Sequence, residues 1–272
     1  MRNVLRTRGL TCCCLTIATL LVAARPAFSQ TEPERLSPLG SKADATASAA
    51  TVPLPEFSKL FSDIVGDFRH LPSRDTAVLL GIGAGAAVAG HRADVSSSRA
   101  LSSSNGLHEA LESGQTIGGM PFQLGVAVAA YAIGRQAGSS RATKVGAELI
   151  RAQVLSEATT YAIKAVANRT RPDGTARSFP SGHSSSAFAS ATVLQRNFGW
   201  KIGIPAYAVA TYVAASRIQM ERHYLSDVIF GAAMGIAAGR TVTVGRGSAR
   251  FAMAPLVVPG GGAIGFDWAG NR

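Results

Sequence analysis

A tight turn that leads into a helix is predicted by residues 179–189, which read Phe-Pro-Ser-Gly-His-Ser-Ser-Ser-Ala-Phe-Ala. Pro180 and Gly182 favour the turn, and Ser181 can cap the helix that follows. Free backbone N–H groups at a helix start attract an anion, and a glycine lets a ligand approach the backbone closely. We therefore expect His183 beside an anion site, although a capping or solvent-facing histidine would show the same pattern.

A basic segment precedes this turn along the chain. It begins with Lys164 and ends with Arg171-Pro172, seven residues later. On a helix this spacing is almost two turns, so both cations would share one face, and Pro172 would end the helix. Two cations on one face can grip an anion, with the arginine fork matching phosphate oxygens. Taken alone, the segment also fits a solvated basic helix end.

A second histidine, His223, follows the turn. Asp227 stands four residues after it and Arg217 six residues before it. On a helix His223 and Asp227 would share a face and could form a hydrogen bond. A carboxylate on one imidazole nitrogen would fix the tautomer and leave the other nitrogen free to attack. An ordinary surface pair is the alternative reading of this segment by itself.

The three segments together resemble the signature of the type 2 phosphatidic acid phosphatase and vanadium haloperoxidase superfamily. Lys-x6-Arg-Pro, Pro-Ser-Gly-His and Ser-Arg-x5-His-x3-Asp occur in this order between residues 164 and 227. Three ordered blocks are a far stronger signal than a single short motif. One departure is Glu221-Arg222, where family members often have a small residue before the histidine; we expect this charged pair to face solvent.

The resemblance implies a role for each matching residue. His223 would attack phosphorus and become a phosphohistidine, Asp227 would orient it, and His183 would protonate the leaving alkoxide and then activate water. The phosphate oxygens would be held by Lys164, Arg171, Ser181, Gly182 and Arg217.

The same pattern indicates that no metal or other cofactor is needed. Phosphoryl transfer requires positioning and positive charge on the equatorial oxygens, which three fixed cations and a helix start can supply. We find no His-Glu-x-x-His element and no clustered carboxylates in the sequence. We therefore expect a metal-independent phosphohydrolase.

The rest of the chain predicts an all-α protein, a helical bundle of about six or seven helices. The serine-rich residues 95–106 indicate a loop, and residues 246–272 indicate a short C-terminal β-hairpin tail around Pro259-Gly260-Gly261-Gly262. A lone hairpin is marginally stable, so it must pack on something. Helices are expected over residues 57–68, 76–90, 117–134, 145–169, 182–198, 202–216 and 223–240.

The N-terminus has the pattern of an export signal. Residues 1–29 hold a basic start, an uncharged apolar stretch, and Ala27-Phe28-Ser29 as a cleavage site. Residues 30–56 are rich in Ser, Thr, Ala and Pro and predict a flexible linker, followed by the phosphatase domain at residues 57–245. All three cysteines lie in the signal, so a cleaved chain would have no disulfide.

Charge and hydropathy limit the classes of molecule that the protein is expected to bind. The formal net charge is +11, and residues 1–29 hold four arginines and no acidic residue, so the rest of the chain carries +7. A surplus of this size fits an anionic substrate or an anionic membrane surface. A nucleic acid is not expected, because there is no basic stripe with interleaved aromatic residues. Residues 117–134 reach the lower limit of length for a membrane span, whereas residues 76–90 fall short of it. The sequence does not predict the oligomeric state.

Four functions are compatible with these observations. The preferred one is a phosphatase embedded in a bacterial-type inner membrane, with a periplasm-facing site for phosphatidate or a polyprenyl diphosphate. A soluble periplasmic acid phosphatase of broad specificity is the second. A vanadium-dependent haloperoxidase is weaker, because those relatives are generally much larger. A non-catalytic phospholipid-binding protein is also weaker, because binding alone requires the cations and not two histidines.

Overall fold

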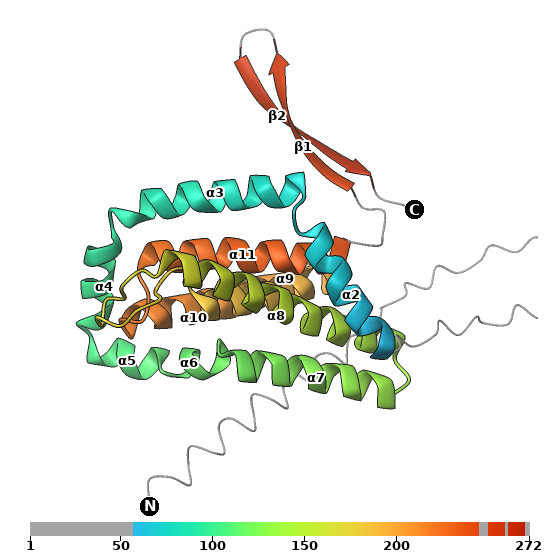
Figure 1. Cartoon of the computed structure of the whole chain (residues 1–272), viewed down its shortest axis with the longest axis horizontal. Coiled ribbons are helices and arrows are strands. Elements are labelled where there is room, and N and C mark those ends of the chain that lie inside the picture. Colours follow the sequence, from blue (N-terminus) through green and yellow to red (C-terminus); the bar gives the residue numbers. More distant parts are fainter. Residues whose placement is uncertain (1–56, 245–249, 259–260, 270–272) are drawn as a thin grey trace, which may run out of the picture.

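The computed structural model describes residues 57–244, 250–258 and 261–269. The predicted signal peptide and linker, residues 1–56, lie outside the described residues. Figure 1 shows α3 along one side of the central helices and α7 along the other, with α4 and α5 at one end. The helices are α2 (Phe57–His70), α3 (Arg74–His91), α4 (Asp94–Ser102), α5 (Asn105–Leu111), α6 (Ser113–Ile117), α7 (Met120–Gln136), α8 (Ser140–Ala167), α9 (Gly182–Phe198), α10 (Trp200–Gln219) and α11 (Leu225–Val244).

The closest helix pair in the bundle is α9 with α11. Gly231, Gly235 and Gly239 recur every fourth residue along α11 and so share one face. A Cβ at any of the three would come closer than 3.0 Å to backbone atoms of α9 or of its N-cap residue, Ser181. Without side chains at these positions the two backbones can approach, as small residues allow in tightly packed bundles. This contact places the first turn of α11 beside the turn that begins α9.

The hydrophobic core lies between α7, α8, α9 and α11. Val145, Leu155 and Val193 are at most 1% exposed, and Tyr131 joins them from α7. Burying aliphatic side chains of this size contributes roughly 1.5–3 kcal/mol each. The core therefore fixes α8 and α9, which carry the chemistry-bearing segments, against each other.

The all-α expectation is confirmed for residues 57–244, but two of its details are wrong. The serine-rich segment forms α4 and α5 instead of a loop. Serine is a weak helix former by itself. Here Asp94, at the start of α4, accepts hydrogen bonds from Ser226 and Arg169 far along the chain, and this tertiary contact holds the segment. The bundle accordingly has more helices than the six or seven expected.

The second wrong detail is the start of the helix expected over residues 117–134, which forms from Met120 onward as α7. The structure ends α6 at Ile117 and starts α7 at Met120, with a bend of 54° between the α5–α6 segment and α7. Gly118 and Gly119 lie at the break. A Cβ on Gly118 would lie 3.2 Å from the Cβ of His183, so the break lets the chain pass close to the site.

The C-terminal segment forms two strands, β1 (Arg250–Val258) and β2 (Gly261–Ala269), paired antiparallel from Arg250 opposite Ala269 to Val258 opposite Gly261. Within the described residues, no helix packs extensively against either strand, and Figure 1 shows them projecting from the bundle. The support that a lone hairpin requires is therefore not found. The expected hairpin is not supported as a stable unit, and the site does not involve it.

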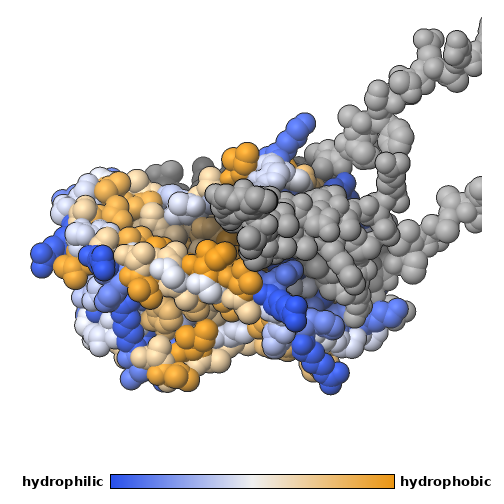
Figure 2. All heavy atoms as spheres, turned by 90° about the horizontal axis from the view of Figure 1, so that it is seen from above, coloured by the Kyte–Doolittle hydropathy of each residue, from blue (hydrophilic) through white to orange (hydrophobic). Residues whose placement is uncertain are grey.

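Hydropathy allows a membrane location without requiring one. Among residues 57–244, one helix, Leu225–Thr243, is long and apolar enough to cross a membrane, and 67% of that stretch is buried inside the molecule. Figure 2 shows apolar side chains over the middle of one face and hydrophilic ones toward both ends. The exposed large apolar side chains of α3 are Val78, Ile82 and Val88.

Candidate active site

The basic segment is split between a helix and the loop that follows it. Asn168 is left-handed, with φ of 39°, and caps α8 after Ala167, so the expected helix through Arg171 is wrong. Lys164 stays on the last turn and donates from Nζ to the carbonyl of Arg177, at 2.8 Å. Arg171 lies in the loop, and its Nε is buried without a hydrogen-bond partner within the described residues. The loop, not a shared helix face, brings the two cations into the site.

The turn before α9 forms as the sequence indicates. Ser181 is the N-cap, and its Oγ accepts hydrogen bonds from the N–H and the hydroxyl of Ser184, at 3.4 and 3.0 Å. His183 lies in the first turn of α9. The open side of Gly182 faces α8, because a Cβ there would lie 3.6 Å from Thr160.

His223 precedes α11 and does not lie on it. Its Nδ1 is 3.8 Å from Oδ2 of Asp227, too long for the expected hydrogen bond, and has no hydrogen-bond partner within the described residues. Oδ2 of Asp227 instead accepts from the Tyr224 N–H, at 2.9 Å, and from the Ser178 hydroxyl. The two residues are neighbours in the site, but not on one helix face.

Arg217 completes the cluster from the last turn of α10. It is 4% exposed, its Nη1 donates to the sulfur of Met220, and its Nε has no partner within the described residues. In addition to burial, the positive charge of Arg217 lowers the pKa of His183, on α9. Burial and the positive charge of Arg171, in the loop after α8, lower the pKa of Arg217. Burial and the positive charge of Lys164 likewise lower the pKa of both His183 and His223. The predicted site residues thus converge from α8, its following loop, α9, α10 and the turn before α11.

A family comparison agrees with this convergence. Residues 145–249, which include every predicted site residue, match the family model described as the PAP2 superfamily. The chain carries a PAP2 superfamily domain. The match covers α8 from Val145 onward and α9 to α11, and the expected resemblance to this superfamily is confirmed.

Similar proteins share parts of this PAP2 domain. A lipid A 1-phosphatase of Porphyromonas gingivalis is 47% identical over 75 residues, which are 26% of this chain and 17% of that protein. The chain thus spans about a sixth of the length of this curated relative.

Two solved structures are also similar. LpxE of Aquifex aeolicus has a TM-score of 0.48 at 21% identity, over 55% of this chain and 93% of that one. A transmembrane PAP2 type phosphatidylglycerolphosphate phosphatase of Bacillus subtilis has a TM-score of 0.47 at 23% identity, over 62% of this chain and 92% of that one.

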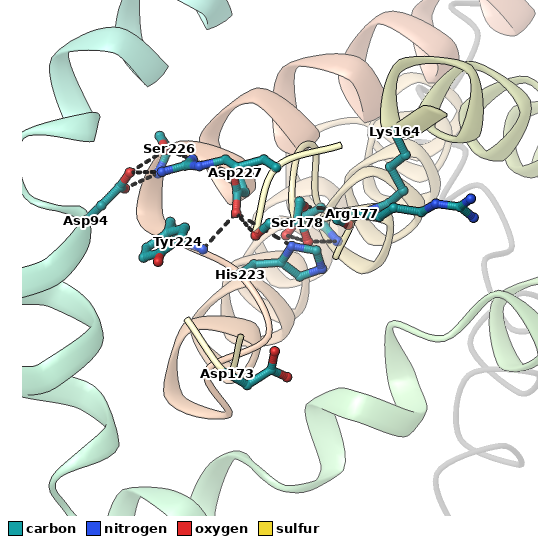
Figure 3. Close-up of polar contacts among 12 residues, drawn as sticks. Asp94, Lys164, Asp173, Arg177, Ser178, His223, Tyr224, Ser226 and Asp227 are labelled. Atoms are coloured by element: carbon teal, nitrogen blue, oxygen red, sulfur yellow. Dashed lines mark hydrogen bonds and ion pairs between the residues drawn. The ribbon is translucent and has the colours of Figure 1, made fainter. Parts of the chain in front are cut away.

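The PAP2 domain contains an arginine that positions Asp227, at a place in the motif where the sequence pattern specifies no residue type. Arg169 lies inside Lys-x6-Arg-Pro at an unspecified position, and its Nη1 donates to Oδ1 of Asp227 at 2.7 Å. Its guanidinium stacks on the ring of Tyr224, 4.3 Å from the centroid. Asp227 therefore receives Arg169, Ser178 and a backbone N–H at the same time, as Figure 3 shows around its carboxylate.

Asp94 extends this network outside the PAP2 domain. It is 2% exposed and accepts from Nη2 of Arg169, at 2.8 Å, and from the N–H and hydroxyl of Ser226, at 2.8 and 2.7 Å. Figure 3 shows it reaching from α4 to the start of α11. Sequence reasoning missed it because the serine-rich segment was interpreted as a loop. The partners of Asp94 are 75 and 132 residues away along the chain, so its role becomes visible only when α4 lies against α11.

Burial and positive charge keep both histidines neutral in the absence of an anion. Burial lowers the pKa of His183 to about 4, and the positive charges of Arg217 and Lys164 act in the same direction. Burial also lowers the pKa of His223 to about 4; Asp227 opposes the shift, while Lys164 and Arg171 add to it. A neutral His223 can act as a nucleophile, and a neutral His183 must gain a proton before it can act as an acid.

Within the described residues, no group of three or more His, Cys, Asp or Glu side chains is placed to hold a metal ion. The charged groups that face the two histidines are cations and Asp227. This arrangement is suited to binding a compact anion between two imidazoles.

Proposed function

We propose that this protein is a metal-independent phosphohydrolase that cleaves lipid phosphate monoesters or diphosphates through a phosphohistidine on His223. The observation that carries the proposal is the meeting of the buried His223 and the half-buried His183 with Arg171 and Arg217. Each arginine has a buried Nε without a partner within the described residues. Buried donors of this kind are costly unless a ligand satisfies them, and phosphate oxygens match the arginine fork.

The first step uses the geometry on both sides of the phosphate. Lys164, Arg171 and Arg217 hold the non-bridging oxygens, together with the N–H groups at the start of α9. The free nitrogen of His223 attacks phosphorus and forms a P–N bond, while the P–O bond to the lipid breaks. His183 gives its proton to the departing alkoxide, so that the lipid leaves as an alcohol or, from a diphosphate, as a monophosphate.

The second step reverses the proton transfer. His183, now neutral, takes a proton from water, and the resulting hydroxide attacks phosphorus. The P–N bond breaks, inorganic phosphate forms, and His223 returns to its neutral state. Asp227 supports the positive charge on His223 while the intermediate lasts. The 3.8 Å gap between these residues is compatible with this role, because catalytic hydrogen bonds often shorten only in the complex.

The protonation states fit this sequence when the anion is bound. A phosphate dianion among the cations raises the pKa of His183 from its low ligand-free value, because the negative charge favours the imidazolium form. The substrate thus prepares its own general acid. His223 faces Lys164 and Arg171 as well, which keep it neutral and nucleophilic.

A lipid substrate and a membrane location are supported by the apolar surface and by the relatives. The similar protein of Porphyromonas gingivalis is described as a lipid A 1-phosphatase. The apolar band in Figure 2 and the Leu225–Thr243 stretch fit an inner-membrane enzyme. We place the site on the periplasmic side, in line with the export signal.

A soluble periplasmic acid phosphatase is the second candidate. It is favoured by the burial of 67% of the Leu225–Thr243 stretch, since the core helix of a soluble bundle has the same character. Alkaline carbonate extraction separates the two: the preferred function requires the protein to stay in the membrane pellet, and release by osmotic shock favours the alternative.

The decisive experiment measures phosphate release by the purified protein. The panel contains phosphatidate, undecaprenyl diphosphate, a lipid A phosphate and p-nitrophenyl phosphate. His223→Ala should abolish turnover, whereas His70→Ala, at the exposed end of α2, should not change it. The proposal fails if His223→Ala keeps near-normal activity. With p-nitrophenyl phosphate, whose leaving group needs no proton from His183, the phosphohistidine should accumulate in His183→Ala and be detectable by mass spectrometry, because its hydrolysis needs the base.

A further inference from the structure

An apolar groove lies between α7, α9 and α10 and has a cavity volume of about 250 Å³. Its walls are aliphatic and aromatic side chains from all three helices, with one contribution each from α6 and α8. The lining includes Ile117 of α6, Leu194 and Phe198 of α9, and Ala206 and Val209 of α10.

The groove follows the face of α9 that carries His183. Ala187, Ala191, Leu194 and Phe198 line it, at four, eight, eleven and fifteen residues after His183. These spacings place all of them on one side of the helix. The groove therefore begins one helical turn from the histidine that lies beside the phosphate.

The end of the short helix α6 lies between the groove and the site. Ile117, its last residue, lines the groove, and the next residue, Gly118, packs against His183, where a Cβ would lie 3.2 Å from the Cβ of the histidine. On its other side α6 borders a polar cavity of about 390 Å³ lined by residues that include Gln115, Thr116 and Arg222. The phosphate site thus has a polar cavity on one side and an apolar groove on the other.

The polar side chains in the groove are already bonded to the protein. The Ser190 hydroxyl donates to Oε1 of Gln123 at 2.7 Å and accepts from Nε2 of Gln153 at 2.8 Å. Nε2 of Gln123 donates to the carbonyl of Ile117 at 2.8 Å. A polar ligand would have to break these bonds, whereas a hydrocarbon chain would leave them intact and bury apolar surface.

We propose that the groove binds one hydrocarbon chain of the lipid phosphate whose phosphate lies between His183 and His223. The inference rests on the proposed function and adds to it the place where the lipid tail is held. From Ala187 to Phe198 the groove follows α9 for about 16 Å, at 1.5 Å per residue. A chain in this position would orient the ester oxygen toward His183, which protonates it.

The test uses a series of alkyl monophosphates of increasing chain length, each below its critical micelle concentration and in one detergent. In the natural protein kcat/KM should rise about fourfold for each added methylene, the factor that corresponds to burying one methylene, until the groove is filled. p-Nitrophenyl phosphate serves as the reference substrate without a chain.

Two substitutions should flatten this dependence. Ala206→Trp places a ring in the groove from a half-buried position on α10, and Val209→Asp places a charge there from a position that is 48% exposed. The matched control is Ala208→Trp, on the exposed face of the same helix, which should keep the dependence of the natural protein. Each variant is compared as the ratio of long-chain to p-nitrophenyl phosphate hydrolysis, which corrects for loss of folded protein.

The outcomes separate this inference from the proposed function. Equal hydrolysis of short and long chains by the natural protein, or an unchanged dependence in both groove variants, would overturn the groove as the chain site while leaving the phosphatase intact. Failure to hydrolyse any member of the series or the reference substrate would overturn the proposed function and, with it, this inference.

Discussion

The turn that carries His183 and the turn that carries His223 border the same site, but different kinds of contact hold them. Ser181 caps the first turn through Ser184, three residues away. The second turn depends on Asp227, which is bonded to Ser178 and Arg169, 49 and 58 residues away, and through Arg169 to Asp94. The side-chain bonds of the first turn are thus local, and those of Asp227 at the second turn reach distant residues. A change in the second should therefore affect both folding and chemistry.

Asp227→Asn should have the largest effect, because it changes the residue whose distant contacts hold the second turn. The amide keeps the volume but removes the charge that faces Arg169 and His223. We expect kcat to fall about 1,000- to 10,000-fold, as when the orienting carboxylate of a catalytic histidine is lost. The free energy of unfolding should drop by about 1.5–3 kcal/mol, because the half-buried Arg169 loses one of its two carboxylate partners and keeps Asp94.

Phosphate release and thermal unfolding in detergent measure both effects of Asp227→Asn. The control is Asp75→Asn, which also removes an acidic residue from the first turn of a helix, but at an exposed position on α3. Equal effects of the two substitutions would show that the network around Asp227 has no special role.

Acid should weaken the fold through both histidines. Their pKa in the folded protein is about 4, below the ordinary value of 6.5, so the unfolded chain binds protons first as pH falls. The stability is fully present above pH 6.5 and is lost between there and pH 4. The loss should reach about 3 kcal/mol for each histidine. Thermal unfolding across this range should be flatter in the double variant His183→Gln/His223→Gln; an identical profile would contradict the prediction.

Arg169→Met tests positioning apart from phosphate binding. We expect kcat to fall about 10- to 100-fold with a smaller change in KM, because the arginine touches Asp227 and not the substrate. Loss of its positive charge should also raise the pKa of His223 and move the acidic limb of the kcat/KM profile to higher pH. A merely structural role would leave that limb in place. Arg135→Met, which also removes an arginine stacked on a tyrosine, is the control.

Ser181→Ala should have the smallest effect on folding. The change removes a local cap, and we expect a loss of about 1 kcal/mol in the free energy of unfolding without substrate. Ser139→Ala, at the N-cap of α8, removes the same kind of bond and should cost a similar amount. If Ser181→Ala destabilised the protein as much as Asp227→Asn, the distinction between a local and a tertiary turn would be wrong.

The sequence predicted well those features that depend on neighbours along the chain. The cap at Ser181 and the helix after it follow from residue types within one turn. The three motif blocks indicated the family because residue identity at set spacings is written in the chain. The helix end after Lys164 was missed because Asn168, four residues before Pro172, adopts a left-handed conformation and stops the helix earlier.

The sequence did not predict those features that depend on contacts between distant residues. α4 was missed because its stability comes from Asp94 meeting Ser226 and Arg169, and serine-rich segments seldom form helices without such contacts. The expected bond between His223 and Asp227 was wrong for the same reason. The Tyr224 N–H, just before α11, and the Ser178 hydroxyl, in the loop after α8, occupy the carboxylate oxygen that the local spacing assigned to the histidine.

Residue identities and spacings by themselves therefore determined the all-helical character, the family and the set of groups suited to phosphate. Only the tertiary structure decided how those groups meet, which residues orient Asp227, and that an apolar groove leads away from His183. The reason is physical. A cap or a helix period depends on contacts a few residues apart, whereas hydrogen-bond partners and cavities depend on which segments the packing of the core brings together.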